Sequence, residues 1–525
     1  MADTMQLPIL PLVSDYLLHA ARQRGSQVAM SLGDRRLTFG ECDLEVKYLS
    51  QALMEMGVKQ GDRVAMLCTP RPEFFLTFLA VSSIGAIWVG VNPRNSVEET
   101  EFVLGDCAPR VLISIVKFRD RDYTADLVRL TSEHPDLRVV TIGGEVPGSL
   151  PFGDLLEMGK SKDLSVPSGS RAQLTGREPA LIVYTSGSTG KSKGALLSHY
   201  GLIHSYLGQL RHFGSAPMVD VCNLPINHIG CMDLCCMPLL SCGTIHFMEQ
   251  FDPEGLLRLI EQERVTFLGQ VPTMFQLIAE SPRFQSANLS SLTTLTWSGS
   301  AMPASLIKAY RSRTKARMMV TYGLTEAIAA ITYSASDADD DTLSTTIGKP
   351  DPLVDVRLVT SDGSLCDNGV EGEIQVRHDA GMLGYYNRPE STVEAFTPDG
   401  YLRTGDLAVV RPDGNLVLVG RLKDMFKSGG YNVYPREIEL CLENHPCVAL
   451  AAVVSVKDPV YQEVGHAFVI PKPGQSPTVD ELKLWCREHL ANYKIPKRIV
   501  IAEDLPKLPI GKVDKQALKR LAESS

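Results

Sequence analysis

The sequence predicts an α/β protein with a large N-terminal part and a small C-terminal part, and three observations support this. From Arg63 to about Tyr322, short apolar runs alternate with segments of helical period, which is typical of parallel sheets covered by helices on both faces. After about Thr346 the strand segments alternate in polarity and are separated by Asp-Gly or Asn-Gly pairs, as in antiparallel hairpins. After Gly420, helical and strand segments alternate again over a short span.

The longest apolar run, residues 74–91, has 18 consecutive uncharged residues and therefore the length of a membrane span. Ser82, Ser83 and Gly85 interrupt it, and its second half is rich in β-formers. We expect a buried helix, a short turn and a buried parallel strand instead. The first residues lack a basic stretch followed by an apolar one, and the final AESS matches no targeting tail, so we expect a cytoplasmic protein without a membrane span.

The composition excludes several classes of protein. The 525 residues are 44% hydrophobic and 22% charged, which rules out a wholly disordered chain. The net charge of -9 argues against a general nucleic-acid binder, because such a protein needs a basic surface. Twelve cysteines are too few for a disulfide scaffold and indicate reduced thiols. Residues 421–525 carry 16 basic and 13 acidic residues, a net charge of +3, which is compatible with a lid over a polyanion or with chance asymmetry of solvated faces.

The strongest local pattern is the segment 184–194, YTSGSTGKSKG, which directly follows the apolar run ALIV. A strand that leads into a loop of glycine, hydroxyl residues and two lysines is suited to phosphate, because backbone amides and side-chain donors can all point inward. The loop is not a Walker A motif, since Thr185 stands where that motif requires its first glycine. A flexible Gly/Ser connector is the alternative interpretation.

This loop resembles the phosphate loop of the adenylate-forming superfamily, which contains acyl-CoA synthetases, adenylation domains and luciferases. The family pattern has proline before the second lysine, where this chain has Ser192. The resemblance extends from about residue 30 to Lys515, and it implies an ATP-binding loop made of Thr185, Ser186, Gly187, Ser188, Thr189, Gly190, Lys191 and Lys193.

The resemblance also implies a fold. Residues 1–420 would form a large domain of two doubly wound α/β sheets plus a β-barrel-like subdomain. Residues 424–525 would form a small, mobile α+β lid domain that rotates about a hinge at Lys423.

The remaining nucleotide contacts are implied by three further motifs. The resemblance implies that, in the segment TYGLTEA, Tyr322 stacks on adenine, Thr325 contacts the α-phosphate and Glu326 binds Mg²⁺. A carboxylate is a hard ligand and suits the role of Glu326. Without the resemblance, Thr325 and Glu326 could simply begin a helix. The ribose would be bound by Asp406 and approached by Arg421, and the adenine edge would lie on the small residues Gly299, Ser300 and Ala301.

The C-terminal part contributes catalytic positions through the same resemblance. Lys512 would bridge the carboxylate and ATP in the first step, and Lys427 would act in the second. Gly429 and Gly430 would leave room for the pantetheine arm of CoA. Taken alone, each lysine would be read as a solvated surface charge.

The acyl substrate would lie against the segment 225–240, PINHIGCMDLCCMPLL. His228 would close over the carboxylate, and the pocket would be lined by His228, Ile229, Gly230, Asp233 and Gly323. No Lys or Arg occurs from Val221 to Gln250, which favours an apolar monocarboxylic acid, and this part of the chain resembles fatty-acid and carnitine-type CoA ligases. The five cysteines between Cys222 and Cys242 are irregularly spaced, so we interpret them as buried core thiols and not as a metal site.

The sequence therefore predicts an ATP- and Mg²⁺-dependent ligase that makes an acyl-adenylate and transfers the acyl group to coenzyme A. A ligase that loads a carrier-protein pantetheine and a luciferase-like oxidative enzyme remain alternatives. The expected partners are a small carboxylic acid and CoA, with a homodimer possible and no nucleic acid.

Overall fold

The computed structural model describes residues 7–162, 164, 169–185, 192–328, 330–507 and 513–524. The chain divides into two units that are each assembled from several segments. Unit 1 consists of Met1–Leu343, Asp351–Val354 and Arg377–Leu402, and unit 2 of Ser344–Pro350, Asp355–Val376 and Arg403–Ser525. The boundary predicted near Lys423, about which the lid would rotate, stays a prediction.

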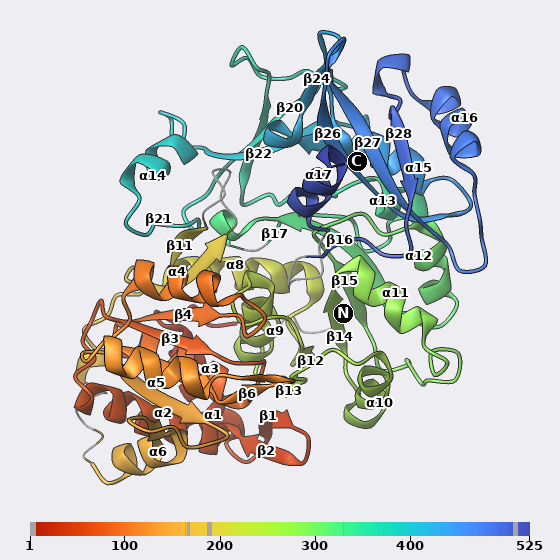
Figure 1. Ribbon diagram of the computed structural model, residues 1–525. Helices are drawn as coiled ribbons and strands as arrows, with labels where there is room; N and C mark the ends of the chain where they lie inside the picture. The colour runs from red at the N-terminus through yellow and green to blue at the C-terminus, as the bar shows by residue number, and fades with distance from the viewer. Residues whose placement is uncertain are drawn as a thin grey trace. The chain divides into compact units, whose positions relative to one another are not determined.

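The larger sheet of unit 1 has the strand order β21-β11-β10-β4-β3-β5-β8-β9. Figure 1 labels β21, β11, β4 and β3 of this sheet. The strands from β10 to β9 pair in parallel, and β11 and β21 add an antiparallel edge. The bounds are β3 Arg63–Leu67, β4 Ile87–Val91, β5 Val111–Ile115, β8 Arg138–Ile142, β9 Leu150–Pro151, β10 Pro179–Thr185, β11 Lys193–Ser198 and β21 Gly384–Tyr385. Every residue of β4 and β5 is buried, as expected for parallel strands covered on both faces.

Helices of the N-terminal segment pack around this sheet. Their bounds are α1 Val13–Arg24, α2 Phe39–Glu55, α3 Pro72–Ser83, α4 Val97–Cys107, α5 Thr124–Glu133 and α6 Phe152–Lys160, and a short hairpin consists of β6 Lys117–Phe118 and β7 Arg121–Asp122. Helix α2 packs against both α3 and α6. Thr38 and Ser96 begin α2 and α4 as N-caps, each with a glutamate three residues later that closes a capping box.

The apolar run at residues 74–91 forms a helix, a turn and a strand, as predicted. All twelve residues of α3 are buried, Gly85 turns the chain with a φ of +76°, and β4 follows. No helix in the part of the chain that the structure describes is long and apolar enough to cross a membrane.

Two smaller sheets complete the strand framework of unit 1. One has the order β12-β13-β1-β2, and in the other β14, β15 and β16 pair in parallel with β17 antiparallel beside them. The bounds are β1 Val28–Leu32, β2 Arg35–Thr38, β12 Val219–Cys222, β13 Thr244–Phe247, β14 Phe267–Gln270, β15 Thr294–Trp297, β16 Arg317–Gly323 and β17 Ala330–Tyr333. The helices in this part of the chain are α8 His199–Phe213, α9 Ile229–Leu240, α10 Pro253–Glu263, α11 Pro272–Glu280 and α12 Ala304–Arg311, and α14 Pro389–Ala395 packs against β21 of the larger sheet. The two predicted α/β sheets are thus present as the sheet of β21 to β9 and the sheet that contains β14, β15 and β16. The sheet β12-β13-β1-β2 is a further, small one.

The β-rich segment forms an open sheet. Its order is β19-β20-β22-β23, with bounds β19 Asp355–Val359, β20 Gly372–Arg377, β22 Leu402–Val410 and β23 Leu416–Arg421. Among the described residues its two edge strands do not pair with each other, so the predicted barrel-like closure is wrong. This sheet has four strands, fewer than the about eight strands at which a closed barrel has an interior filled by side chains. Before this sheet the chain runs through α13 Asp340–Thr345 and β18 Lys349–Pro350.

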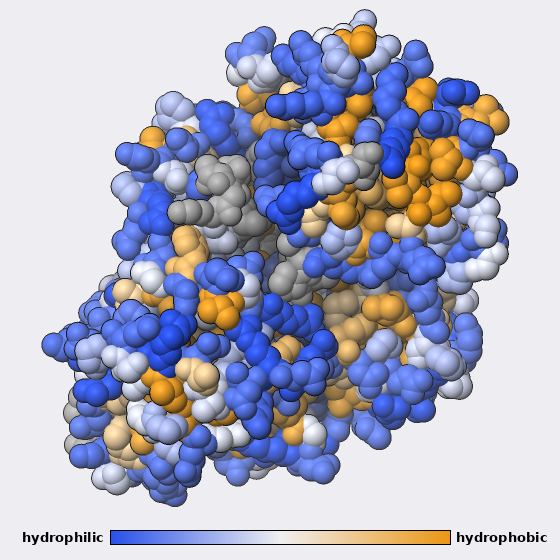
Figure 2. Space-filling view, in the orientation of Figure 1, coloured by the Kyte–Doolittle hydropathy of each residue, from blue (hydrophilic) through white to orange (hydrophobic). Residues whose placement is uncertain are grey.

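The C-terminal segment forms a sheet of order β25-β24-β27-β26, with β28 parallel to β27. Its bounds are β24 Phe426–Ser428, β25 Tyr431–Val433, β26 Val448–Asp458, β27 Gln462–Pro471 and β28 Arg498–Ile501, with helices α15 Pro435–Glu443, α16 Val479–His489 and α17 Lys515–Glu523. Alternate residues of β26 face opposite cores: Val453 packs with Ile438, and Val454 packs with Leu518. Figure 2 shows apolar side chains gathered over this C-terminal part, where Ile501 and Leu521 are exposed.

Candidate nucleotide and acyl site

Two of the predicted nucleotide-binding segments of unit 1, at Gly299 and at Tyr322, lie where parallel strands end. Strand β15 ends at Trp297 and leads directly into Ser298–Gly299, while its parallel neighbour β16 ends at Gly323. Because the carboxyl ends of parallel strands meet at one edge, these two segments leave the same edge of the sheet. Gly299 has a φ of +85°, which side chains disfavour, and Gly299, Ser300 and Ala301 are all exposed.

Glu326 is the residue that joins three distant segments of unit 1. Its Oε1 atom accepts a hydrogen bond of 3.2 Å from Oγ1 of Thr185, at the end of β10, and one of 2.9 Å from the hydroxyl of Tyr385 in β21. Its backbone carbonyl accepts a bond of 2.8 Å from the amide of Met382. We call Thr185, Glu326 and Tyr385 the Glu326 cluster. Both side-chain bonds go to Oε1, so Oε2 accepts none from the described residues.

A cation stands beside this cluster. Lys193 pairs with Thr185 across β10 and β11, and its Nζ atom lies 5.4 Å from the ring centroid of Tyr385. Burial and then the neighbouring Glu326 charge raise the pKa of Tyr385, so its hydroxyl remains a hydrogen-bond donor. The loop residues between these two strands, Ser186, Gly187, Ser188, Thr189, Gly190 and Lys191, lie outside the described residues.

The strand that carries Thr185 is anchored one residue earlier. The hydroxyl of Tyr184 donates a bond of 2.8 Å to Oδ2 of Asp106 in α4, and Arg388 bonds the other oxygen of the same carboxylate. The Asp106 side chain is nearly buried, so this pair of donors compensates for its desolvation. Burial and the Asp106 charge raise the pKa of Tyr184. The anchor fixes the position from which the glycine-rich loop starts.

The segment TYGLTEA contains three further predicted site residues, Tyr322, Gly323 and Thr325. Tyr322 and Thr325 are buried and Gly323 is exposed, with Thr325 and Glu326 in the short helix η1 Thr325–Ala327. The roles of Tyr322 at adenine and of Thr325 at the α-phosphate stay predictions.

Asp406 and Arg421 meet in unit 2. They are register partners in β22 and β23, and Nε of Arg421 lies 2.7 Å from Oδ1 of Asp406. The aspartate side chain is buried and the arginine side chain is half exposed. The structure thus brings together two residues that the sequence places in one ribose-binding group, while the ribose contact itself stays a prediction.

The backbone conformation explains why two of the predicted lid residues are glycines. Gly429 and Gly430 are the central residues of a two-residue hairpin between β24 and β25, with φ values of +58° and +87°. These values fit a type I′ turn, which favours glycine at both positions. Lys423 and Lys427 are exposed in the same region, and Lys512 lies outside the described residues.

His228 begins the predicted acyl-binding helix. Its Nδ1 atom accepts a bond of 3.0 Å from the amide of Gly230, so the neutral ring carries its proton on Nε2. Along α9, Gly230 and Asp233 are half-buried, whereas Ile229 and the other nine residues of the helix are buried. Because positions three apart share a helix face, Gly230 and Asp233 mark the least buried face of α9.

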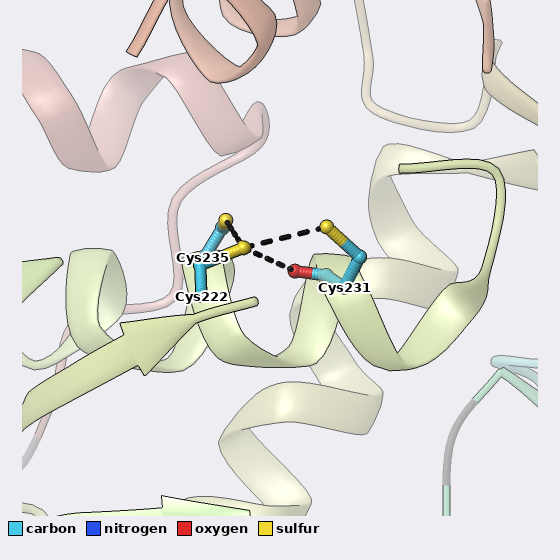
Figure 3. A group of neighbouring side chains, drawn as sticks. All are labelled: Cys222, Cys231 and Cys235. Carbon is cyan, nitrogen blue, oxygen red and sulfur yellow. Dashed lines mark hydrogen bonds between the residues drawn. The ribbon is translucent and has the colours of Figure 1, made fainter. Parts of the chain in front are cut away.

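Three of the five cysteines in this region lie together (Figure 3). The Sγ atom of Cys222 is 3.4 Å from that of Cys231 and 3.4 Å from that of Cys235, and all three residues are buried. Burial raises the pKa of Cys231 and Cys235, which keeps these thiols protonated, while at Cys222 burial is outweighed by hydrogen bonds from both neighbours, which lower its pKa. The group offers three ligand atoms, one fewer than a closed structural zinc site needs. We therefore keep the interpretation as packed core thiols.

Sequence reasoning missed Tyr385, Asp106 and Arg388. Tyr385 and Arg388 belong to the segment GYYNRPE, whose strand β21 has only two residues and hence no detectable period. Asp106 lies 78 residues before its partner Tyr184. The two adjacent tyrosines, Tyr385 and Tyr386, are the one visible signal in this segment. The sequence does not show that Tyr385 bonds Glu326.

Comparisons with known proteins find similar sequences over most of the chain. A family model described as AMP-binding enzyme matches residues 17–386, and one described as AMP-binding enzyme C-terminal domain matches residues 437–512. Feruloyl-CoA synthase of Amycolatopsis sp is 36% identical over 502 residues, which cover 95% of this chain and 97% of that protein. Indoleacetate–CoA ligase of Aromatoleum aromaticum is 33% identical, with 96% of each chain covered.

Solved structures are similar over the whole length. The anthranilate CoA ligase AuaEII in complex with anthranoyl-AMP has a TM-score of 0.87 at 26% identity, with 99% of each chain covered. ATP-bound MatB from Rhodopseudomonas palustris has a TM-score of 0.86 at 25% identity, with 98% of this chain and 99% of that chain covered.

Proposed function

The chain belongs to the AMP-binding enzyme family, which confirms the resemblance to the adenylate-forming superfamily, and from this premise we propose how it works as an acyl-CoA ligase. It is an AMP-forming ligase that joins a carboxylic acid to coenzyme A with ATP. The acid first attacks the α-phosphate, which gives an acyl-adenylate and releases pyrophosphate. The thiol of CoA then attacks the acyl carbon, which gives the thioester and releases AMP.

The Glu326 cluster is the observation that carries this proposal. The first step brings a carboxylate to a polyanion, so it depends on positioning and on neutralising charge. The cluster joins the two flanks of the glycine-rich loop, Thr185 and Lys193, to the segment that holds Thr325 and Glu326. Hydroxyl donors and an ammonium group thereby stand at the base of the proposed phosphate loop.

Magnesium fits the donor set at Glu326. Thr185 and Tyr385 hold Oε1 in place, while Oε2 accepts no bond from the described residues. A positioned carboxylate oxygen is a ligand that Mg²⁺ prefers, and the ion, when bound, neutralises phosphate charge. Thr185 and Tyr385 would orient the carboxylate for that purpose.

The acid would lie along α9, with its carboxylate near His228. The absence of Lys and Arg from Val221 to Gln250 leaves no cation in this segment for a second carboxylate, which supports a monocarboxylic acid with an apolar body. The names of three similar proteins refer to feruloyl, indoleacetate and anthranilate groups, which all contain an aromatic ring. We therefore propose an aromatic or comparably ring-bearing acid.

In the C-terminal part, Lys512 would assist the first step, and Lys427 and the Gly429–Gly430 turn would serve the second. Residues 424–525 would act as a lid that turns about Lys423 between the steps. Asp406 and Arg421 would bind the ribose.

The test is a panel of carboxylic acids incubated with ATP and Mg²⁺, with pyrophosphate and AMP measured separately. We expect acid-dependent pyrophosphate release and CoA-dependent AMP release in equal amounts. AMP release that needs a holo carrier protein, or oxygen uptake without thioester formation, would replace the CoA ligase by one of the two alternatives. No nucleotide cleavage with any acid would contradict the proposal.

A further inference from the structure

Three thiols from two elements meet in the interior of unit 1 (Figure 3). Cys222 is the last residue of β12, and Cys231 and Cys235 are four positions apart in α9, so the latter two share one helix face. The Sγ atom of Cys222 lies 3.4 Å from the Sγ atom of each of the other two. We call Cys222, Cys231 and Cys235 the Cys222 cluster, because Cys222 is the member in contact with both others.

The three thiols are not chemically equivalent. Cys235 donates a hydrogen bond to Sγ of Cys222, and Cys231 can do the same. Burial raises the pKa of Cys231 and Cys235, but at Cys222 the hydrogen bonds from both neighbours outweigh burial and lower the pKa. Since the thiolate is the nucleophilic form of cysteine, Cys222 is the sulfur that reacts first with an electrophile.

The chain between Cys222 and Cys231 belongs to the proposed acyl site. These two cysteines enclose residues 223–230, which lead from β12 into α9 and include His228. Five of these eight residues are only half-buried, although the three sulfurs are buried. A small uncharged reagent therefore reaches the sulfurs when this segment opens locally.

We propose that hydrogen peroxide oxidises the Cys222 cluster to a disulfide between Cys222 and one of its two neighbours, and that this bond reversibly switches off acyl-adenylate formation. The Cys222 thiolate attacks one peroxide oxygen and the O–O bond breaks. The leaving hydroxide takes up the proton that Cys222 had released and becomes water, while Cys222 becomes a sulfenic acid. The sulfur of Cys231 or Cys235 then displaces the hydroxyl group, which leaves as a second water with the proton of that thiol. The two sulfurs lose two electrons and peroxide gains them.

Such a bond would restrain the segment that holds His228. A disulfide requires an S–S distance of about 2.05 Å, so the two sulfurs have to approach from 3.4 Å and then stay joined. Either partner of Cys222 ties the end of β12 to the start of α9. The inference rests on the proposed function, because His228 closes over the substrate carboxylate only if this segment can move. A misplacement of about 1 Å can lower a rate about 100-fold.

The disulfide is detected without any substrate. After incubation with hydrogen peroxide, free thiols are alkylated and the protein is cleaved before aspartates, since no Lys or Arg between Arg211 and Arg258 separates these cysteines for trypsin. Cleavage before Asp220 and Asp233 gives the fragment 220–232, which holds Cys222 and Cys231, apart from the fragment that holds Cys235. We expect the fragment 220–232 either to be unalkylated and lighter by the lost hydrogens, or to be joined to the fragment that begins at Asp233.

The switch is measured on the same samples by pyrophosphate release with the acid that the enzyme turns over best. Oxidation should lower this activity at least about tenfold, and dithiothreitol should restore it. Cys222→Ala and the double variant Cys231→Ala, Cys235→Ala should both resist peroxide. Cys107→Ala is the matched control, because Cys107 is a buried thiol of α4 that bonds a backbone carbonyl, and it should stay as sensitive as the wild type. Each variant is compared with its own untreated sample, so that any damage to the fold cancels.

The outcomes separate this inference from the ligase function. The absence of a disulfide at Cys222, full peroxide sensitivity in Cys222→Ala, or unchanged pyrophosphate release in the disulfide form would overturn the inference and leave the ligase function intact. A disulfide at Cys222 in a protein that releases no pyrophosphate with any acid, even before oxidation, would instead contradict the proposed function and with it the switch.

Discussion

At the scale of single residues, the site depends on side chains whose partners are distant in sequence. Glu326 is separated by 141 residues from Thr185 and by 59 from Tyr385. The motif TYGLTEA identified Glu326, but no pattern could identify Tyr385, because the contact exists only after folding. Asp233 could be proposed from its residue type alone. The face of α9 on which it lies could not be read from the sequence.

The substitution Glu326→Gln tests the centre of the cluster. The new amide oxygen would still accept bonds from Thr185 and Tyr385 but would lack the negative charge that Mg²⁺ needs, so kcat for pyrophosphate release should fall about 100-fold or more. The melting temperature should change little. Tyr385→Phe, which removes one positioning bond, should cost about tenfold, and Glu390→Gln on the exposed α14 serves as a matched control. A Glu326→Gln enzyme with ordinary activity would remove this residue from the mechanism.

At the scale of elements, the sequence predicted those whose pattern is local and continuous. The run at 74–91 was assigned correctly because a fully buried helix followed by a buried parallel strand leaves an unbroken apolar sequence. The closure of the β-rich segment was assigned incorrectly because alternation and turn residues describe hairpins equally well in open and closed sheets. How the edge strands meet is not encoded in any single strand.

His199, the first residue of α8, makes the fold sensitive to acid. Its Nδ1 accepts a bond from the amide of Val13 and its Nε2 bonds the carbonyl of Ser82, an arrangement that requires the neutral ring. Burial lowers the pKa of His199 from 6.5 to about 4. Because the unfolded chain binds this proton more readily, stability is complete above pH 6.5 and decreases as the pH falls toward 4.

The size of this effect can be measured by urea unfolding at several pH values. The His199 contribution amounts to about 3 kcal/mol between pH 6.5 and 4. His199→Gln can keep one donor and one acceptor without titrating, so the variant should lose less stability than the wild type over this range. Identical pH profiles for the two proteins would exclude His199 as the titrating group.

The hairpin between β24 and β25 allows the role of Gly430 to be separated from its backbone conformation. At a φ of +87° valine is strained, whereas asparagine is tolerated, so Gly430→Val should unfold at lower temperature and Gly430→Asn should not. If CoA passes here, Gly430→Asn should still form acyl-adenylate but make thioester slowly. Gly474→Asn, at a comparable φ of +76° with open space around it, is the matched control. Thioester formation at the wild-type rate in Gly430→Asn would contradict the tunnel.

At the scale of the whole molecule, the chain matches one family over nearly its full length, yet its two units are not successive halves of the sequence. Unit 2 takes up segments from before and after Arg377–Leu402, which belongs to unit 1. Composition and charge could exclude classes of function, but they could not reveal this interleaving. The order of motifs along the chain identified the reaction class, because that order is independent of how the segments pack.

The division of labour between the large domain and the lid is tested with Lys512. Lys512→Ala should abolish acyl-adenylate formation while thioester formation from supplied acyl-adenylate continues, because only the first step brings two anions together. Lys507→Ala, five residues earlier and paired with Asp504, is the control and should affect neither step. Both half-reactions are followed separately, by pyrophosphate release and by thioester formation. Equal loss of the two would show that the lysine supports the fold or serves both steps.

The Glu326 cluster has a consequence for how activity appears as the chain folds. Its three members come from β10, η1 and β21, and the bonds among them close loops of 141 and 59 residues. Contacts between residues so far apart form late, because the chain entropy of closing long loops has to be overcome first. During refolding, helical content should therefore return well before catalysis does, because pyrophosphate release cannot recover until these distant segments of unit 1 have met.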